Sequence, residues 1–280
     1  RRQRQMCIRD SVSNDNRTIK LGSLKTLQEI CSITGHSNNI NAIAISSNGL
    51  IMVTGSENQT IKIWNLQTKS EFLTFSGHSS PIESACISSN NQIVASGDRS
   101  GIIKLWDVKT GTEILSNITG HSSLIWTLAI TPDNKTLVSG GQDHIINTWN
   151  LNDGEQIHSI TGHSAYILKV AISSDSQTLV SASEDKTIKI WNIKTGEEIR
   201  TLTGHSHHIK SLAISPNGQF IVSGSYDNVI KVWELNTGKE IKYFPNVHSG
   251  GVWNLAISPD GYTLVTGGGD NLIKIWRVQD

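Results

Sequence analysis

The sequence has few cysteines and no long apolar run. Its 280 residues include three cysteines, Cys7, Cys31 and Cys86, which are too few and too scattered for a disulfide framework or a zinc site. No stretch of about 18 apolar residues occurs, which excludes a membrane-spanning helix. With 36% hydrophobic and 17% charged residues, the composition predicts a soluble, ordered protein. Scarce cysteine and the lack of a signal sequence favour the cytoplasm.

An excess of charge is also lacking. The 24 basic and 24 acidic residues cancel, which argues against a broad surface for nucleic acid or anionic lipid. No phosphate loop of the Walker or dinucleotide type is present, because Gly267-Gly268-Gly269 lies in a β-turn context. We therefore expect no cofactor, no nucleic-acid or membrane partner, and no small-molecule substrate.

Residues 1–11 do not read as native protein sequence. The string RRQRQMCIRDS resembles the translation of a transposase-end adapter from sequencing libraries. The alternative is a natural basic N-terminus. On the first interpretation the chain is a metagenomic fragment, and the fold begins at about residue 12.

A repeat of 42 or 43 residues dominates the rest of the chain. In every unit a histidine lies 28 residues before a tryptophan, and the pairs are His36/Trp64, His78/Trp106, His121/Trp149, His163/Trp191, His205/Trp233 and His248/Trp276. Glycine precedes the histidine in all but the last unit. The connection from each tryptophan to the next histidine is 14 or 15 residues. A constant interior with variable connectors predicts packed units joined by surface loops.

Each unit has the pattern of four short strands. In the fourth unit the alternating segments are 168–173, 178–182, 187–191 and 198–202, separated by polar turns. Period-2 alternation with many β-branched residues favours antiparallel β-structure, and no segment has a sustained helical period. Four short strands cannot bury both faces, so neighbouring units must supply the core.

These units resemble the WD-repeat family of β-propellers over about residues 16–280. The dipeptide Trp106-Asp107 matches the family signature, whereas Asn, Glu or Arg follows the tryptophan elsewhere. The resemblance implies an all-β propeller with six nearly complete four-stranded blades over residues 35–280.

Residues 12–34 are predicted to be a truncated seventh blade. Segment 18–21 aligns with the third strand 187–190, and segment 29–33 aligns with the fourth strand of later units. The last unit ends without a fourth strand, which in this family the start of the chain commonly supplies. We therefore expect a native ring of seven blades. Alternatively, segment 29–33 pairs with the last unit and closes six.

The resemblance also implies a buried hydrogen-bonded tetrad in each blade. Its members are the histidine, a Ser or Thr ten residues before the tryptophan, an Asp six residues before it, and the tryptophan. Four units fit completely: His121/Ser139/Asp143/Trp149, His163/Ser181/Asp185/Trp191, His205/Ser223/Asp227/Trp233 and His248/Thr266/Asp270/Trp276. The first two units depart from the pattern, with Asn58 and Ser100 at the acidic position.

Two chemical roles, catalysis by the tetrad residues and metal binding by a histidine pair, are weaker interpretations. A Ser–His–Asp set suggests a hydrolase triad, but a catalytic set occurs once, whereas this one recurs in every unit. The adjacent His207 and His208 suggest a metal site, but neighbouring strand side chains point to opposite faces. We interpret that pair as part of a surface loop, and we expect no metal site.

Function is expected where the repeats differ. We call three sets of variable positions the rim positions, because the family resemblance places them on one face. Five residues after the histidine stand Asn41, Glu83, Trp126, Leu168, Lys210 and Trp253. Before the acidic position stand Glu57, Arg99, Gln142, Glu184, Tyr226 and Gly269. Three residues after the histidine stand Asn39, Pro81, Leu124, Tyr166, His208 and Gly251.

The rim positions predict a noncatalytic scaffold that binds a peptide or partner domain. Binding energy would come from the aromatic residues Trp126, Trp253, Tyr166 and Tyr226, and specificity from Glu83, Arg99, Glu184 and Lys210. Alternatively, the indoles of Trp126 and Trp253 only fill the mouth of the central funnel. Similar arrays in bacterial signalling proteins suggest a kinase or nucleotide-switch module upstream.

The other functional class is a propeller enzyme or carbohydrate-binding propeller that uses the central channel. Its innermost strands would need titratable residues, and segment 42–45 is apolar.

Overall fold

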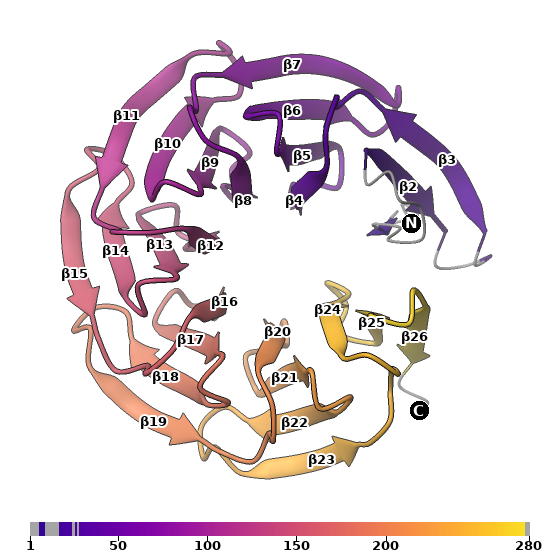
Figure 1. Ribbon diagram of the computed structural model, residues 1–280, viewed down its shortest axis with the longest axis vertical. Helices are drawn as coiled ribbons and strands as arrows, with labels where there is room; N and C mark the ends of the chain where they lie inside the picture. Colours follow the sequence, from indigo (N-terminus) through magenta and orange to yellow (C-terminus); the bar gives the residue numbers. More distant parts are fainter. Residues whose placement is uncertain (1–5, 9–16, 24–25, 27, 278–280) are drawn as a thin grey trace. The chain divides into compact units, whose positions relative to one another are not determined.

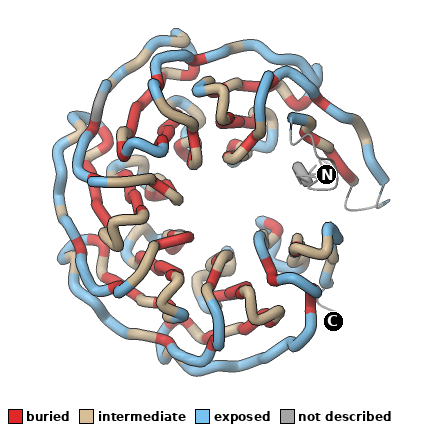
Figure 2. Tube along the Cα trace, in the orientation of Figure 1, coloured by how far each residue is buried: buried red, intermediate tan, exposed pale blue. Residues whose placement is uncertain are grey.

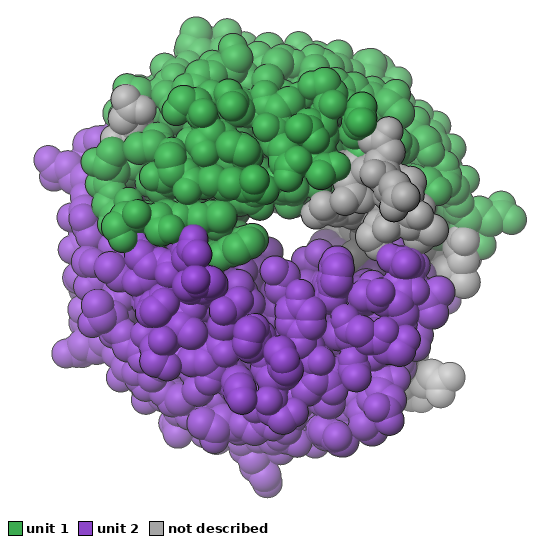
Figure 3. Space-filling view, in the orientation of Figure 1, with its two compact units in different colours: residues 1–128 green, residues 129–280 purple. Residues whose placement is uncertain are grey.

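The computed structural model describes residues 6–8, 17–23, 26 and 28–277, and these form β-strands joined by turns (Figure 1). No helix within these ranges is long and apolar enough to cross a membrane. The chain divides into two compact units, Arg1–Leu128 and Ala129–Asp280 (Figure 3). Each unit is described by itself below.

The first unit contains three antiparallel sheets, in each of which neighbouring strands are consecutive in the sequence. The strands of the first sheet are β1 (Met6–Ile8), β2 (Thr18–Gly22) and β3 (Glu29–Thr34). Those of the second are β4 (Ile40–Ile45), β5 (Ile51–Ser56), β6 (Thr60–Asn65) and β7 (Ser70–Ser76). Those of the third are β8 (Ile82–Ile87), β9 (Ile93–Asp98), β10 (Ile102–Asp107) and β11 (Glu113–Thr119).

The second unit repeats this plan. The division between the units falls within β12 (Ile125–Ile130), and the strands that follow are β13 (Thr136–Gly141), β14 (Ile146–Asn150) and β15 (Gln156–Ile160). The next sheet contains β16 (Ile167–Ile172), β17 (Thr178–Ser183), β18 (Ile188–Asn192) and β19 (Glu198–Leu202). The next contains β20 (Ile209–Ile214), β21 (Phe220–Ser225), β22 (Ile230–Glu234) and β23 (Glu240–Phe244). The last contains β24 (Val252–Ile257), β25 (Thr263–Gly268) and β26 (Ile273–Arg277).

Successive sheets within a unit pack face to face. In the second unit the first strands β16, β20 and β24 are neighbours at the inner ends of their sheets, and β19 and β23 are the outer strands (Figure 1). The middle strands carry most of the buried residues (Figure 2). The packing is close enough to require small residues. A Cβ at Gly55 would lie 2.5 Å from Ile82 of the next sheet, and one at Gly224 would lie 2.5 Å from Val252.

The predicted fold class is confirmed: the described chain is all-β, and the strands have the predicted pattern. The two strands expected within 12–34 are present as β2 and β3, which pair with each other in antiparallel register. Segment 29–33 thus pairs with β2. Met6–Ile8, within the adapter-like segment, forms β1, which pairs with the edge of β2 that faces away from β3. In the next sheet β5 pairs with the corresponding edge of β6. That β2 and β3 are the remainder of a seventh blade stays a prediction.

Candidate functional site

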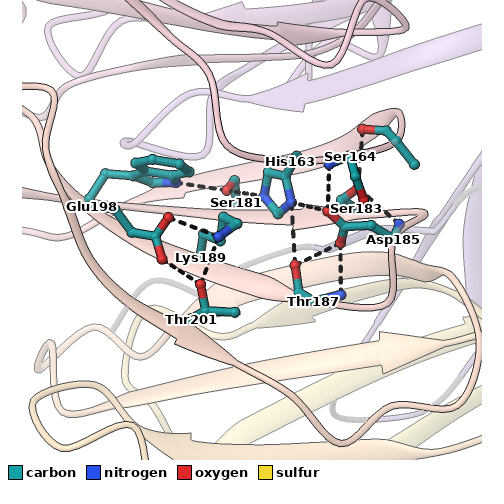
Figure 4. A network of polar contacts seen from close by, with 11 residues as sticks. His163, Ser164, Ser181, Ser183, Asp185, Thr187, Lys189, Glu198 and Thr201 are labelled. Atoms are coloured by element: carbon teal, nitrogen blue, oxygen red, sulfur yellow. Dashed lines mark hydrogen bonds and ion pairs between the residues drawn. The ribbon is translucent and has the colours of Figure 1, made fainter.

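The fourth repeat brings its predicted tetrad together in one line of hydrogen bonds (Figure 4). Trp191 Nε1 lies 2.8 Å from Ser181 Oγ, which is 2.7 Å from His163 Nε2. His163 Nδ1 lies 2.7 Å from Asp185 Oδ2. The carboxylate can only accept, so Nδ1 donates to it, the serine hydroxyl donates to Nε2, and the indole N–H donates to the serine oxygen. Every polar atom along the line is therefore satisfied.

The carboxylate at the end of the line is held in its ionised form. Burial alone would raise the pKa of Asp185, but hydrogen bonds from His163 and Thr187 hold it well below its usual range. The backbone N–H groups of Ser164 and Thr187 also donate to it. One side chain thus joins the loop before β16 to the turn between β17 and β18.

The glycine before the histidine of the fourth repeat, Gly162, is required by close packing. A Cβ at Gly162 would lie 2.8 Å from Cη2 of Trp191, and the φ of Gly162 is +155°. The tryptophan ring therefore packs directly against the backbone of the loop that carries the histidine.

The fifth and sixth repeats have the same arrangement. In the fifth, the imidazole contacts the acid over 2.8 Å and the indole contacts the hydroxyl over 2.9 Å, in the pairs His205–Asp227 and Trp233–Ser223. In the sixth repeat the corresponding contacts are His248–Asp270, His248–Thr266 and Trp276–Thr266, at 2.8, 2.9 and 3.2 Å. The predicted tetrads of these two repeats are therefore present.

In the third repeat the structure shows the bond between two members of the tetrad and a turn contact of Asp143. Trp149 donates to Ser139 over 2.8 Å, as the other repeats do. Within the second unit, Asp143 Oδ1 accepts from the backbone N–H of Ile145 over 3.2 Å, so that the acid holds the turn between β13 and β14. The expected partner, His121, belongs to the first unit, whereas the other three residues belong to the second. The structure thus brings together the indole and the hydroxyl of this tetrad, and the bond between His121 and Asp143 stays a prediction.

The side chains of the acids at the expected offset are largely buried in the fourth, fifth and sixth repeats, where Asp185, Asp227 and Asp270 are 8%, 7% and 10% exposed. As whole residues, backbone included, these three acids and Asp143 are partly buried. Each lies in the turn between the second and third strands of its sheet, and turns of this kind run along the surface. The histidine and hydroxyl members of these tetrads are buried as well.

The second repeat obtains its carboxylate from a residue that the sequence pattern missed. His78 Nδ1 lies 2.7 Å from Asp98 Oδ2, and Ser100 Oγ donates to Asp98 Oδ1 over 2.6 Å. Ser100, at the expected acidic position, thus supports the acid rather than replacing it. The fourth and fifth repeats read Ser-x-Asp here, at Ser183/Asp185 and Ser225/Asp227, and this repeat reads Asp-x-Ser. The exchange of two residues across one turn keeps the carboxylate within reach of the imidazole.

The first repeat has no carboxylate in its tetrad. His36 Nε2 lies 2.7 Å from Thr54 Oγ1, and its Nδ1 lies 3.4 Å from Thr60 Oγ1. The Asn58 carbonyl oxygen accepts from Thr60. Burial and the positive charge of Lys62 lower the pKa of His36 to about 4, which the Asn58 amide and the Glu71 carboxylate offset only in part.

We expect Asn58→Asp to raise the pKa of His36 by at least about one unit, because a carboxylate favours the imidazolium form. In the parent chain the folded-state pKa lies below the unfolded value, so stability falls as the pH drops from about 6.5 to about 4. Asn58→Asp should reduce that loss. Titration of the His36 ring by NMR, together with urea unfolding at pH 5, measures both effects.

Asn48→Asp is the matched control for that substitution. Asn48 lies in the turn between β4 and β5, and the equivalent turns carry Asp133, Asp175 and Asp260. The Asn48→Asp substitution adds the same charge away from the imidazole and should leave the pKa of His36 unchanged. An equal shift in both variants would contradict a direct interaction with the carboxylate.

The rim positions of the first unit form a network of charged side chains. Arg99 Nε lies 2.6 Å from Glu83 Oε1, and Arg99 Nη2 lies 3.1 Å from Glu57 Oε1. Asn41 donates to Glu83, and Asn39 donates to Glu57. Glu83 and Arg99, predicted as specificity residues, are thus already paired with each other. The Arg99 side chain remains 44% exposed.

In the second unit the rim residues His208, Tyr226 and Trp253, together with the neighbouring His207, form an aromatic cluster. Tyr226 lies 6.4 Å from Trp253, 5.7 Å from His207 and 6.2 Å from His208, measured between ring centroids. Trp253 is 41% exposed, and its Nε1 donates to the backbone oxygen of Gly250. The cluster therefore presents indole, phenol and imidazole surface together. Sequence reasoning identified Tyr226 and Trp253 but not the contribution of His207.

The other predicted rim residues make separate contacts or are less exposed than Trp253. Tyr166 accepts from Gln142 over 2.9 Å, and its ring lies 5.6 Å from His144. Glu184 lies 3.6 Å from His208 Nδ1. Leu168 is buried, and Lys210 and Trp126 are partly buried.

The histidine pair at 207–208 lies in the loop before β20, as the sequence predicts. The two rings are 4.5 Å apart, and His207 Nδ1 accepts from the backbone N–H of His208. Within the described ranges no three His, Cys, Asp or Glu side chains are arranged to hold a metal ion. The cluster's chemistry is that of aromatic and polar contacts.

Comparison with known protein families matches most of the chain. The family described as IFT122 first beta-propeller matches residues 124–280, more than half of the sequence. The family described as WD domain, G-beta repeat matches residues 27–65 and 69–107. No individual curated protein matches significantly. The repeated tetrads, the four-strand pattern and these matches agree, and the chain belongs to the WD-repeat β-propeller family, in the group of the IFT122 first β-propeller.

Proposed function

We propose that this protein is a noncatalytic scaffold that binds a peptide or partner domain at its rim positions. The aromatic cluster of the second unit carries the proposal. Exposed Trp and Tyr side chains in contact with each other are enriched at protein–protein interfaces and dominate their binding energy. Trp253 and Tyr226 lie on adjacent sheets, so one bound segment can contact both. WD-repeat propellers as a family serve as interaction scaffolds.

The Ser–His–Asp sets support a structural role rather than catalysis. The Ser181 hydroxyl is fully buried, and it donates to His163 while it accepts from Trp191. A catalytic nucleophile needs access to substrate and a free oxygen lone pair aimed at it. The same bonds recur in further repeats, as structural bonds do.

Charged rim residues would set specificity. The Glu57–Arg99–Glu83 network carries two carboxylates for one guanidinium, and Glu184 adds a further acid beside His208. This mixed charge fits a protein or peptide partner better than nucleic acid, which needs a basic surface. A cytoplasmic signalling or regulatory role is part of the proposal and rests on the low cysteine content and the family.

A random-peptide library selected on the whole chain tests the proposal. We expect enriched peptides whose affinity falls by about 2 kcal/mol, roughly thirtyfold in Kd, in Trp253→Ala, because a central interface aromatic is lost. Isothermal titration calorimetry measures the change. Trp126→Ala and the double variant with Trp253→Ala show whether the first unit contributes.

Tyr262→Ala is the matched control. Tyr262 is an exposed aromatic residue in the turn between β24 and β25, at the opposite end of β24 from Trp253. It should leave the affinity unchanged. Peptides that bind Trp253→Ala and Tyr226→Ala as tightly as the parent chain would remove the aromatic cluster from the proposed site.

A further inference from the structure

The aromatic cluster of the second unit is held in place by bonds between two loops. The side-chain oxygen of Asn228, in the turn between β21 and β22, accepts from the backbone N–H groups of Gly250 and Gly251 over 3.0 and 2.7 Å. The ring of Tyr226 packs against the backbone of Gly251, where a Cβ would lie 2.8 Å from Cδ1 of the ring. These contacts hold Trp253 beside Tyr226 without a partner, which lowers the entropy cost of binding one.

The polar edges of the cluster already bind the protein itself. Trp253 Nε1 donates to the backbone oxygen of Gly250 over 2.9 Å, and His207 Nδ1 accepts from the backbone N–H of His208 over 2.8 Å. Trp253, which is 41% exposed, therefore offers a partner its ring rather than its N–H group. The face of an aromatic ring carries partial negative charge and attracts cations.

The loops and turns around the cluster carry more acids than bases. Those that contain or contact its residues span 184–187, 203–208, 226–229, 245–251 and 269–272. Apart from histidine, their ionisable residues are one lysine and four acids, namely Lys186, Glu184, Asp185, Asp227 and Asp270. Lys210 on β20, and Lys274 on β26 with its bond to the backbone oxygen of Val247, offset the acids only in part.

Two of these acids keep their negative charge although each binds a histidine. His205 Nδ1 donates to Asp227 while its Nε2 accepts from a serine hydroxyl, so the imidazole is neutral. His248 and Asp270 repeat this arrangement. Burial alone would raise the pKa of both carboxyl groups, but the hydrogen bonds from the histidines hold each pKa below its usual range. Each pair therefore carries one uncompensated negative charge.

We propose that the aromatic cluster binds a basic segment of a partner protein, with an arginine stacked on the exposed ring of Trp253. This inference rests on the proposed function and names the chemistry of the partner. A guanidinium is planar, stacks on aromatic faces and is more weakly hydrated than an ammonium, so arginine fits the ring better than lysine. The surrounding carboxylates attract a basic segment and repel an acidic one.

A small probe tests the site directly. Nα-acetyl-arginine amide is titrated into the full chain while the Nε1–H signal of Trp253 is followed by NMR, and the spectrum of Trp253→Leu assigns that signal. We expect a saturable shift at millimolar probe. Nα-acetyl-citrulline amide has nearly the same shape without the charge. It should bind at least about fivefold more weakly, because it lacks the cation–π attraction.

Longer ligands test the charge around the ring. A random-peptide library is selected on the full chain and counter-selected on Trp253→Leu, so that only peptides that need the ring remain. We expect these peptides to be net positive and to contain an arginine whose replacement by citrulline weakens binding at least about tenfold. Glu184→Gln should weaken their binding about threefold. Glu197→Gln, in the exposed turn before β19, is the matched control and should leave it unchanged.

Two results would overturn this inference. One is that the arginine probe binds no better than the citrulline probe, and the other is a set of ring-dependent peptides that are neutral or acidic. Ring-dependent peptides of that kind would still support the proposed scaffold function. Selected peptides that all bind the parent chain and Trp253→Leu equally would instead remove the cluster from the proposed site, and this inference with it.

Discussion

Replacing Asp98 with alanine should lower the free energy of unfolding by about 3 kcal/mol, a large share of the stability of a typical domain. Asp98 is 1% exposed, and its carboxylate accepts from His78, from the hydroxyl and N–H of Ser100, and from the N–H of Ile102. Alanine leaves the buried imidazole N–H without an acceptor and frees the turn that follows β9. Urea unfolding monitored by circular dichroism measures the loss.

A double variant that exchanges the residues at positions 98 and 100 is the control for this prediction. The double variant Asp98→Ser/Ser100→Asp recreates the order found at Ser183 and Asp185. It should recover most of the stability, since the carboxylate then reaches the imidazole from the other side of the turn. A double variant as unstable as Asp98→Ala would show that the turn tolerates only the native order.

The same residue shows where sequence reasoning stops. The strands were predictable because alternation and the constant spacing of histidine and tryptophan leave one register for each unit. The acids Asp185, Asp227 and Asp270, at the expected offset, lie 2.7 or 2.8 Å from their histidines. A fixed offset, however, records a position along the chain and not a position in space. Residues 98 and 100 flank one turn, so either can place a carboxylate beside His78.

The rim shows a second limit of the sequence. The pattern assigned Glu83 and Arg99 to one surface, but not the bonds between them. Those bonds depend on the rotamers of the two side chains, which the spacing of residues along the chain does not encode. The same holds for His207, whose contact with Tyr226 joins two loops of one repeat. An aromatic or charged residue next to a predicted rim position is the signal that could have identified it.

Replacing Ser181 with alanine should cost about 2–4 kcal/mol of folding free energy. Its hydroxyl is fully buried between Trp191 Nε1 and His163 Nε2, at 2.8 and 2.7 Å. Removal leaves both nitrogens without their partner, and an unsatisfied buried polar group costs about 1–3 kcal/mol. The indole is also one wall of the packing between sheets. Urea unfolding followed by tryptophan fluorescence measures the effect.

Two further substitutions separate the hydroxyl from the volume it occupies. Ser181→Thr keeps the hydroxyl, and threonine occupies this place in the first repeat, where Thr54 lies 2.7 Å from His36 and 2.8 Å from Trp64. It should retain most of the stability. Ser174→Ala, in the exposed turn after β16, should change the unfolding free energy by less than about 0.5 kcal/mol. If Ser181→Thr were as unstable as Ser181→Ala, tight packing around the side chain, rather than its two hydrogen bonds, would hold this repeat together.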